Sequence, residues 1–125
     1  MWGNPRFVLR TPPTRVLDHA FSDAQTFTGG ARVERSQWSV PFARLTFDRD
    51  AAELSFREPG FRRSPVWILR GEVDAVVPCH GSLWTRGIMF AADPGIFDGV
   101  IFWARRRAEL LEALAGAGWP VDPPA

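Results

Sequence analysis

The spacing of apolar residues changes once along this chain, and that change limits the folds open to it. From about residue 31 to residue 104, apolar residues recur in steps of two or in short continuous runs. In residues 105–117 they recur in steps of three and four. The first pattern is typical of β-strands and the second of an amphipathic α-helix. A run of strands followed by one helix must bury the helix on the sheet or in an open barrel end.

The first hairpin is predicted from residues 42–58. In residues 42–48 an apolar face alternates with a mainly polar one, as a half-buried antiparallel strand requires. Asp48-Arg49-Asp50 is a turn signal, and residues 52–58 form the return strand. Pro41 cannot donate a ladder hydrogen bond, so we expect it at a sheet edge or a bulge. The apolar face consists of Ala43, Leu45 and Phe47.

Further strands follow this hairpin. Residues 65–79 are a strand pair or one bent strand, with Gly71 at the bend. Residues 82–93 predict another strand, broken or bulged near Gly87. Residues 97–104 are apolar on both faces, which predicts a central strand.

The last element is the helix at about residues 105–117. Its stripe consists of Ala108, Leu111, Leu114 and Ala115, widened by Leu110. The glycines near its end, with Pro120 beyond them, stop the helix. The fold class is therefore mainly β with one C-terminal α-helix. We expect a bent antiparallel sheet or partly open barrel of about six or seven strands, capped by this helix.

Residues 1–30 show a mixed pattern. Residues 6–10 predict a short strand, and a short helix follows from Thr14. Thr28-Gly29-Gly30 then interrupts the chain. Thirty residues cannot hold a core alone, so we expect this segment to pack on the same domain as residues 31–121.

Composition narrows the class of protein. The chain has 125 residues, enough for one domain with a real core, and a formal net charge of +1. That charge gives no bulk attraction to nucleic acid, so no nucleic-acid partner is expected. All 15 basic residues are arginine and tyrosine is absent, which indicates GC-rich codons, as in many bacteria. The single cysteine, the lack of a signal-peptide core and the lack of a long apolar run favour a cytoplasmic protein.

A family resemblance rests on several segments read together. VWILRGEVDAVV, a following GIMF strand, GVIFWA and a terminal helix ending in GWPV stand in that order. Over residues 31–121 this resembles the pleckstrin-homology-like barrel, above all its small bacterial members of unknown function. The resemblance implies a domain that binds inositol-lipid head groups, peptides or other protein domains. The fold does not choose among these ligands.

The resemblance also implies that a lipid head group, if bound, would contact loops that carry basic residues. Lipid-binding members carry basic residues around the first hairpin, whereas the matching turn here is Asp48-Arg49-Asp50. Arg62 and Arg63 are the better candidates, because Phe61 and Trp67 flank them. The alternative is a merely exposed loop.

Arg105, Arg106 and Arg107 are the second candidate. They begin a helix that lacks a good capping residue, since Ala104 precedes them, and uncapped amides beside arginines suit an anion. The alternative is a solvated helix start, in which Glu109 pairs with Arg105 or Arg106 and Arg107 is simply hydrated.

No catalytic, metal or cofactor site is predicted. Cys79 and His80 are neighbours on a predicted strand, where side chains alternate, and His19 is expected to be an exposed side chain. One cysteine and two histidines without ligand spacing do not make a zinc site. The scattered carboxylates are expected to face solvent: Asp48, Asp50, Glu72, Asp74, Asp93 and Asp98.

The sequence therefore predicts a non-enzymatic binding or interaction module, with an unknown protein or peptide as its partner. One alternative is binding of an anionic lipid head group by a peripheral membrane protein. Another is a small-ligand carrier or enzyme that uses a cavity in the barrel. The high aromatic content, with residues apolar on both strand faces, also favours a homodimer.

Overall fold

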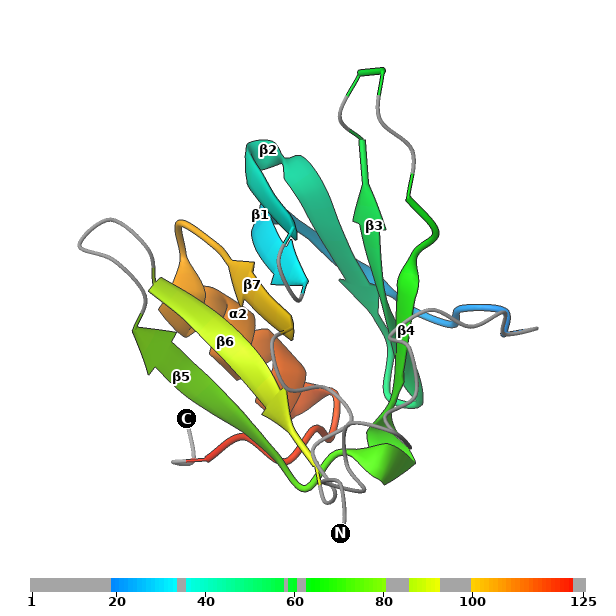
Figure 1. The fold of residues 1–125 in the computed structure, drawn as a ribbon. Helices are drawn as coiled ribbons and strands as arrows, with labels where there is room; N and C mark the ends of the chain where they lie inside the picture. The colour runs from blue at the N-terminus through cyan, green and yellow to red at the C-terminus, as the bar shows by residue number, and fades with distance from the viewer. Residues whose placement is uncertain are drawn as a thin grey trace, which may run out of the picture.

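The computed structural model describes residues 19–33, 36–57, 59–60, 63–80, 86–92 and 100–122. Within these ranges the chain forms seven antiparallel strands in one curled sheet, followed by a C-terminal helix (Figure 1). The predicted class, mainly β with one C-terminal helix, is confirmed. The elements are β1 (Gln25–Val33), β2 (Ser36–Phe47), β3 (Ala51–Phe56), β4 (Val66–Leu69), η1 (Arg70–Glu72), β5 (Ala75–His80), β6 (Arg86–Ala91), β7 (Val100–Trp103) and α2 (Arg107–Gly116).

β1 is the middle strand of the curled sheet and joins its two halves. The strand order is β4-β3-β2-β1-β7-β6-β5, with β1 in the middle. β1 pairs with β2 on both sides of a register shift, and its last part, from Gly30, pairs with β7 as well. We call β5, β6 and β7 the β5–β7 half, and β2, β3 and β4 the β2–β4 half.

The bend lies at Gly29 and Gly30. The pairing of β1 with β2 shifts register between Gly29 and Ala31, which leaves a bulge around Pro41 in β2. Of the two positions expected for Pro41, the bulge is the correct one. A Cβ on Gly29 would collide with the carbonyl oxygen of Trp103, so glycine permits the close approach of β7. The glycines expected to interrupt the chain therefore lie within a strand.

The core lies on the concave side of the sheet, and α2 closes it. Phe47 and Leu54 from the β2–β4 half and Phe90 and Phe102 from the β5–β7 half belong to one buried cluster. Figure 1 shows α2 along the β5–β7 half, behind its strands in this view. The open side of the curl is thus covered by a single helix.

The buried stripe of α2 differs from the predicted one. Leu110 and Leu114 are fully buried, with Leu111, Ala113 and Ala117 partly buried against the core. Ala108 and Ala115 are exposed, contrary to prediction. The two large leucines determine which side faces the core, because a leucine gains far more from burial than an alanine.

The N-terminal segment differs from the prediction as well. The expected strand at residues 6–10 and the start of the helix at Thr14 lie outside the described residues. Residues 19–24 are not helical, and Phe21 stacks on Trp67 of β4 with ring centroids 5.7 Å apart. The boundary expected at residue 31 falls within β1.

The remaining strands lie close to their predicted positions. Residues 65–79 form two strands, β4 and β5, separated by η1 at Gly71, but the two strands lie at opposite edges of the sheet and do not pair with each other. β7 lies between β1 and β6, so its central position is confirmed. β6 begins at Arg86 and pairs with β5 and β7 in unbroken register at Gly87, so the break or bulge expected there is wrong. Residues 81–85 and 93–99 lie outside the described ranges.

β5 is one edge of the sheet, and this edge is occupied. The Val76 N–H donates to the Pro120 carbonyl at 2.8 Å, and the Asp122 N–H donates to the Val76 carbonyl at 2.9 Å. These bonds make a parallel bridge between Val76 and Val121. Two residues further along the strand, Pro78 has no N–H to offer. The outer edge of β5 is therefore a poor template for another strand.

Candidate functional site

The loop arginines were the first predicted site. Arg62 lies outside the described residues. Arg63 is half-buried, with its guanidinium carbon 5.8 Å from the ring centroids of both Trp38 and Phe56. Those two rings are themselves 4.2 Å apart. Arg63 therefore covers aromatic side chains at the margin of the core through a cation–π contact.

The three arginines at the start of α2 were the second predicted site, and each has different contacts. Arg105 precedes α2, and Arg106 is its N-cap without a side-chain capping bond. Arg106 lies 3.7 Å from Glu109, so this expected pair is confirmed. Arg107, which is simply hydrated in the alternative reading, is instead half-buried and donates to the Cys79 carbonyl at 3.4 Å. The first turn of α2 passes the end of β5, which brings Arg107 to that carbonyl.

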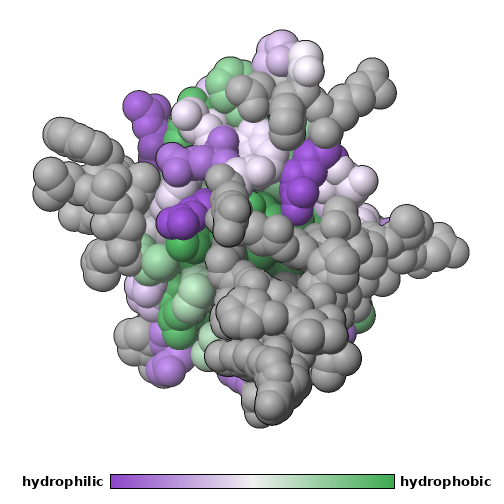
Figure 2. Space-filling model, viewed as in Figure 1, coloured by the Kyte–Doolittle hydropathy of each residue, from purple (hydrophilic) through white to green (hydrophobic). Residues whose placement is uncertain are grey.

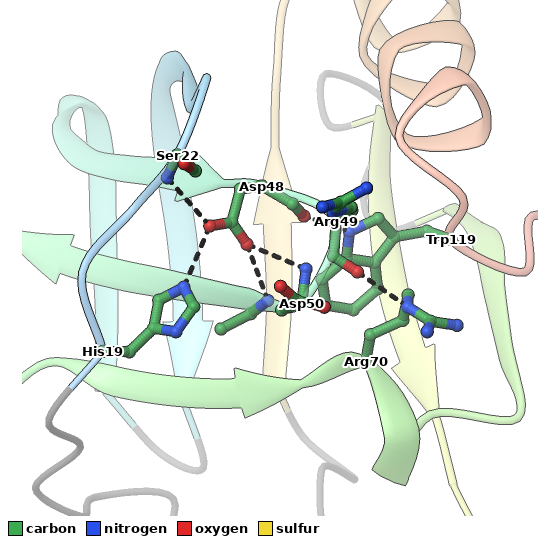
Figure 3. A network of polar contacts seen from close by, with 8 residues as sticks. His19, Ser22, Asp48, Arg49, Asp50, Arg70 and Trp119 are labelled. Carbon is green, nitrogen blue, oxygen red and sulfur yellow. Dashed lines mark hydrogen bonds and ion pairs between the residues drawn. The ribbon is translucent and has the colours of Figure 1, made fainter.

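The structure brings Asp48 and His19 together, which the sequence did not predict. Asp48 is only 3% exposed, although it was expected to face solvent. Its Oδ2 accepts from His19 Nε2 at 2.9 Å and from the Ser22 N–H at 3.2 Å. Its Oδ1 accepts from the N–H groups of Asp50 at 2.8 Å and Ala51 at 3.0 Å. Figure 3 shows these bonds converging on one carboxylate, which we call the Asp48 cluster.

The backbone of the same turn holds two further elements. Trp119, just after α2, donates its indole N–H to the Asp48 carbonyl at 2.7 Å (Figure 3). Arg70 of η1 donates its Nε to the Arg49 carbonyl at 2.7 Å and its backbone N–H to the Asp50 carbonyl at 3.0 Å. The turn between β2 and β3 is thus a junction of four chain segments.

The electrostatics of Asp48 follow from these bonds. Burial raises the pKa of its carboxyl, but hydrogen bonds from the Asp50 N–H, from His19 and from the N–H groups of Ala51 and Ser22 lower the pKa to about 2. Each oxygen already accepts two bonds, and the contact from Ser22 comes from its backbone N–H. The arrangement fastens the N-terminal segment to the turn and does not resemble a nucleophile with its base.

A hollow of about 490 Å³ lies beside this cluster. It is bordered by the segment before β1, the turn after β2 and the end of α2. Its lining residues are Ser22, Asp23, Gln25, Phe47, Asp48, Arg49, Ala113, Gly116 and Ala117. Within the described ranges, no group of three or more histidine, cysteine or acidic residues is arranged to hold a metal ion.

A second feature is the side of the β5–β7 half that faces away from the core. Val77, Met89 and Ile101 form one cross-strand row there, and Cys79 and Trp103 form the next, with Gly87 between them. We call these five side chains the apolar outer face. Each is half-buried, and the cysteine is a free thiol. In Figure 2 hydrophobic surface is visible over β5 and β6.

The corresponding side of β1, β2 and β3 is polar. Its cross-strand rows are Thr26–Thr46–Glu53 and Thr28–Arg44–Ser55. The hydroxyls of Thr26 and Thr46 lie 3.1 Å apart. Antiparallel sheets that face water normally carry polar residues on that side. The β5–β7 half departs from this rule, whereas the neighbouring strands of the same sheet obey it.

No protein-family model, curated protein or solved structure matches this chain. The fold therefore defines the class: a curled antiparallel half-barrel closed on its concave side by one C-terminal helix. Among the described helices, none is long and apolar enough to cross a membrane.

Two features were missed by the sequence reasoning. Asp48 directly precedes a tight turn, and an aspartate there commonly accepts from N–H groups two and three residues on. Residues 97–104 are apolar on both sides and predicted a central strand and self-association, but the sequence did not show that side chains of β5 and β6 complete the same face. His19 gave no local signal, because its partner lies 29 residues away.

Proposed function

We propose that this chain is a non-enzymatic binding module on a pleckstrin-homology-like barrel, and that another protein binds its apolar outer face. The observation that supports the proposal is the contrast within one sheet: apolar side chains cover the outer side of the β5–β7 half, and polar ones cover β1 to β3. Apolar patches bordered by polar surface are typical of interaction sites. Tryptophan and methionine, present here as Trp103 and Met89, are enriched at such interfaces.

A protein fits this face better than a lipid membrane does. A membrane-binding surface needs apolar side chains that project into the acyl region. Here each apolar side chain is half-buried in a sheet face. Among the described residues, the exposed large hydrophobic side chain is Val40, which is 50% exposed and lies outside this face. Arg63, the candidate for lipid head groups, already contacts two aromatic rings.

Site-specific photo-crosslinking in the native host tests the proposal. A photoreactive amino acid replaces Met89 on the apolar outer face or, as a matched control, Thr46 on the polar side. We expect a discrete adduct from position 89 and none from position 46. The protein identified in that adduct should bind the purified chain, and Met89→Lys should abolish the binding.

Two results would overturn the proposal. One is the same set of adducts from both positions, or none from position 89. The other is binding of the purified chain to acidic liposomes that is lost on Met89→Lys, which would assign the face to a membrane.

A further inference from the structure

The size of the apolar outer face limits what can cover it. Its five side chains lie on three strands, which are about 4.8 Å apart, and the Ala75–Ala91 pair adds a third row on the same side, so the rows cover five residues of β5 at about 3.3 Å each. This side is therefore roughly 10 Å by 16 Å, or about 160 Å² in outline. A stable interface buries about 800 Å² on each partner. A second copy of this chain that packed on these side chains alone would fall well short of that area, whereas a short helix needs only this face for a weaker, transient complex.

The edge of β5 excludes a different mode of binding. A partner strand that joined the sheet would have to pair with the outer edge of β5. Val76 already bonds there to Pro120 and Asp122, and Pro78 has no N–H. A partner segment must therefore lie on the face of the strands, with its own backbone hydrogen bonds already satisfied.

An α-helix meets both conditions. Its backbone is paired internally, its diameter with side chains is about 10 Å, and three turns are about 16 Å long. We infer that the apolar outer face takes an amphipathic helix of a partner protein, about three turns long, with acidic residues at one end. This inference rests on the proposed function and names the partner segment for the same surface.

The acidic residues expected at one end of the partner helix follow from the arginines that lie beside the apolar outer face. Arg107 contacts the Cys79 carbonyl, so the start of α2 lies at the Cys79 end of the face. Arg105 is exposed two residues after Trp103, and the Arg106 side chain is 78% exposed. Arg105 therefore puts positive charge at this end of the face, and Arg106 adds to it while also lying 3.7 Å from Glu109, so acidic side chains of a docked helix would lie here.

The inference is tested with synthetic peptides of about 14 residues, enough for three turns and their ends. The helical peptide carries leucines at i, i+3, i+4 and i+7 and two glutamates at one end. A scrambled peptide of the same composition and a peptide with glutamines in place of the glutamates serve as controls. Binding of labelled peptides to the full chain is measured by fluorescence anisotropy at low and high salt.

We expect the helical peptide to bind more than about tenfold tighter than the scrambled one. Met89→Lys should weaken this binding more than about tenfold, and Thr46→Lys should leave it unchanged. Arg105→Gln with Arg106→Gln should weaken binding of the acidic peptide and leave the glutamine peptide unaffected. Circular dichroism verifies that each variant is folded.

Equal binding of helical and scrambled peptides would overturn the inference, and so would retained binding by a folded Met89→Lys variant. The proposed function and the inference of a helical partner can be contradicted independently of each other. An adduct at position 89 whose bound segment is not helical leaves the proposed function standing and overturns the helix. The absence of any adduct at position 89 overturns the proposed function itself.

Discussion

At the scale of single residues, Asp48 shows how a buried charge is kept in this protein. Its carboxylate is removed from water but accepts four hydrogen bonds, two on each oxygen. A buried carboxylate with that many donors stays ionised at neutral pH. The same donors would lose their acceptor if the carboxylate were removed, and an unpaired buried polar group is costly.

Asp48→Asn should destabilise the protein by about 2–4 kcal/mol. The amide keeps the shape of the side chain but turns an N–H₂ group towards N–H donors. Urea denaturation followed by circular dichroism measures the loss. Asp50→Asn is the matched control, since Asp50 is exposed in the same turn, and it should change stability by less than about 0.5 kcal/mol. Equal effects of the two substitutions would show that the cluster contributes nothing.

The stability of the chain should also depend on pH through Asp48. Its pKa is about 2 in the folded protein against an ordinary value of 3.8, so the unfolded chain takes up the proton first. The stabilisation is fully present above about pH 4 and is lost as pH falls towards 2; it amounts to about 2 kcal/mol. Denaturation curves between pH 5 and pH 2 should show this loss in the native protein, and Asp48→Asn should remove that part of it.

At the scale of elements, α2 was predicted in place, and its three leucines were predicted correctly as facing the core, whereas its two predicted alanines were not. The helical spacing after residue 104 was clear, and the helix begins two residues later than expected. Four of its residues are alanines or glycines, which contribute little to the choice of a buried side. The concave surface of the sheet selects Leu110 and Leu114, and only the sheet's curvature defines that surface.

Leu114→Ala should therefore cost about 2–5 kcal/mol, because Leu114 is fully buried in the core. Leu111→Ala removes the same atoms from a half-buried position and should cost clearly less. Thermal and urea denaturation of both variants give the comparison. A larger loss for Leu111→Ala would restore the stripe predicted from the sequence.

The pairing of β6 with β7 depends on Gly87. A Cβ there would lie 2.7 Å from Trp103 Cδ1 and 3.0 Å from the Phe102 carbonyl oxygen. The backbone oxygen cannot move without disturbing the ladder, so Gly87→Ala should destabilise the protein by about 1–3 kcal/mol. Gly71→Ala is the control, because nothing lies within 4 Å of a Cβ at that position. Unchanged stability of Gly87→Ala would mean that β7 can shift.

At the scale of the whole molecule, the sequence predicted the class of fold but not its bend. Alternation and helical spacing are local, and they identified most strands and the helix. β1 was divided at residue 31, because its Gly29-Gly30 pair resembles a loop in isolation. These glycines are needed only because β7 approaches them, which is a contact across about 70 residues. The apolar outer face was hidden for the same reason, since it comes from three strands.

The chain alone should be monomeric at concentrations up to about 100 μM, because its apolar outer face is too small for a stable dimer. Light scattering coupled to size-exclusion chromatography over a range of loading concentrations measures this. A dimer that disappears on Met89→Lys would instead show that a second copy occupies the face.

The bond between Trp119 and Asp48 joins residues 71 positions apart. Asp48 lies in the first hairpin of the sheet, whereas Trp119 follows the last element. During synthesis the hairpin is made first, α2 follows it, and Trp119, which supplies the indole, comes after α2. The concave side of the early strands therefore stays without α2 and without this hydrogen bond until residue 119 has left the ribosome.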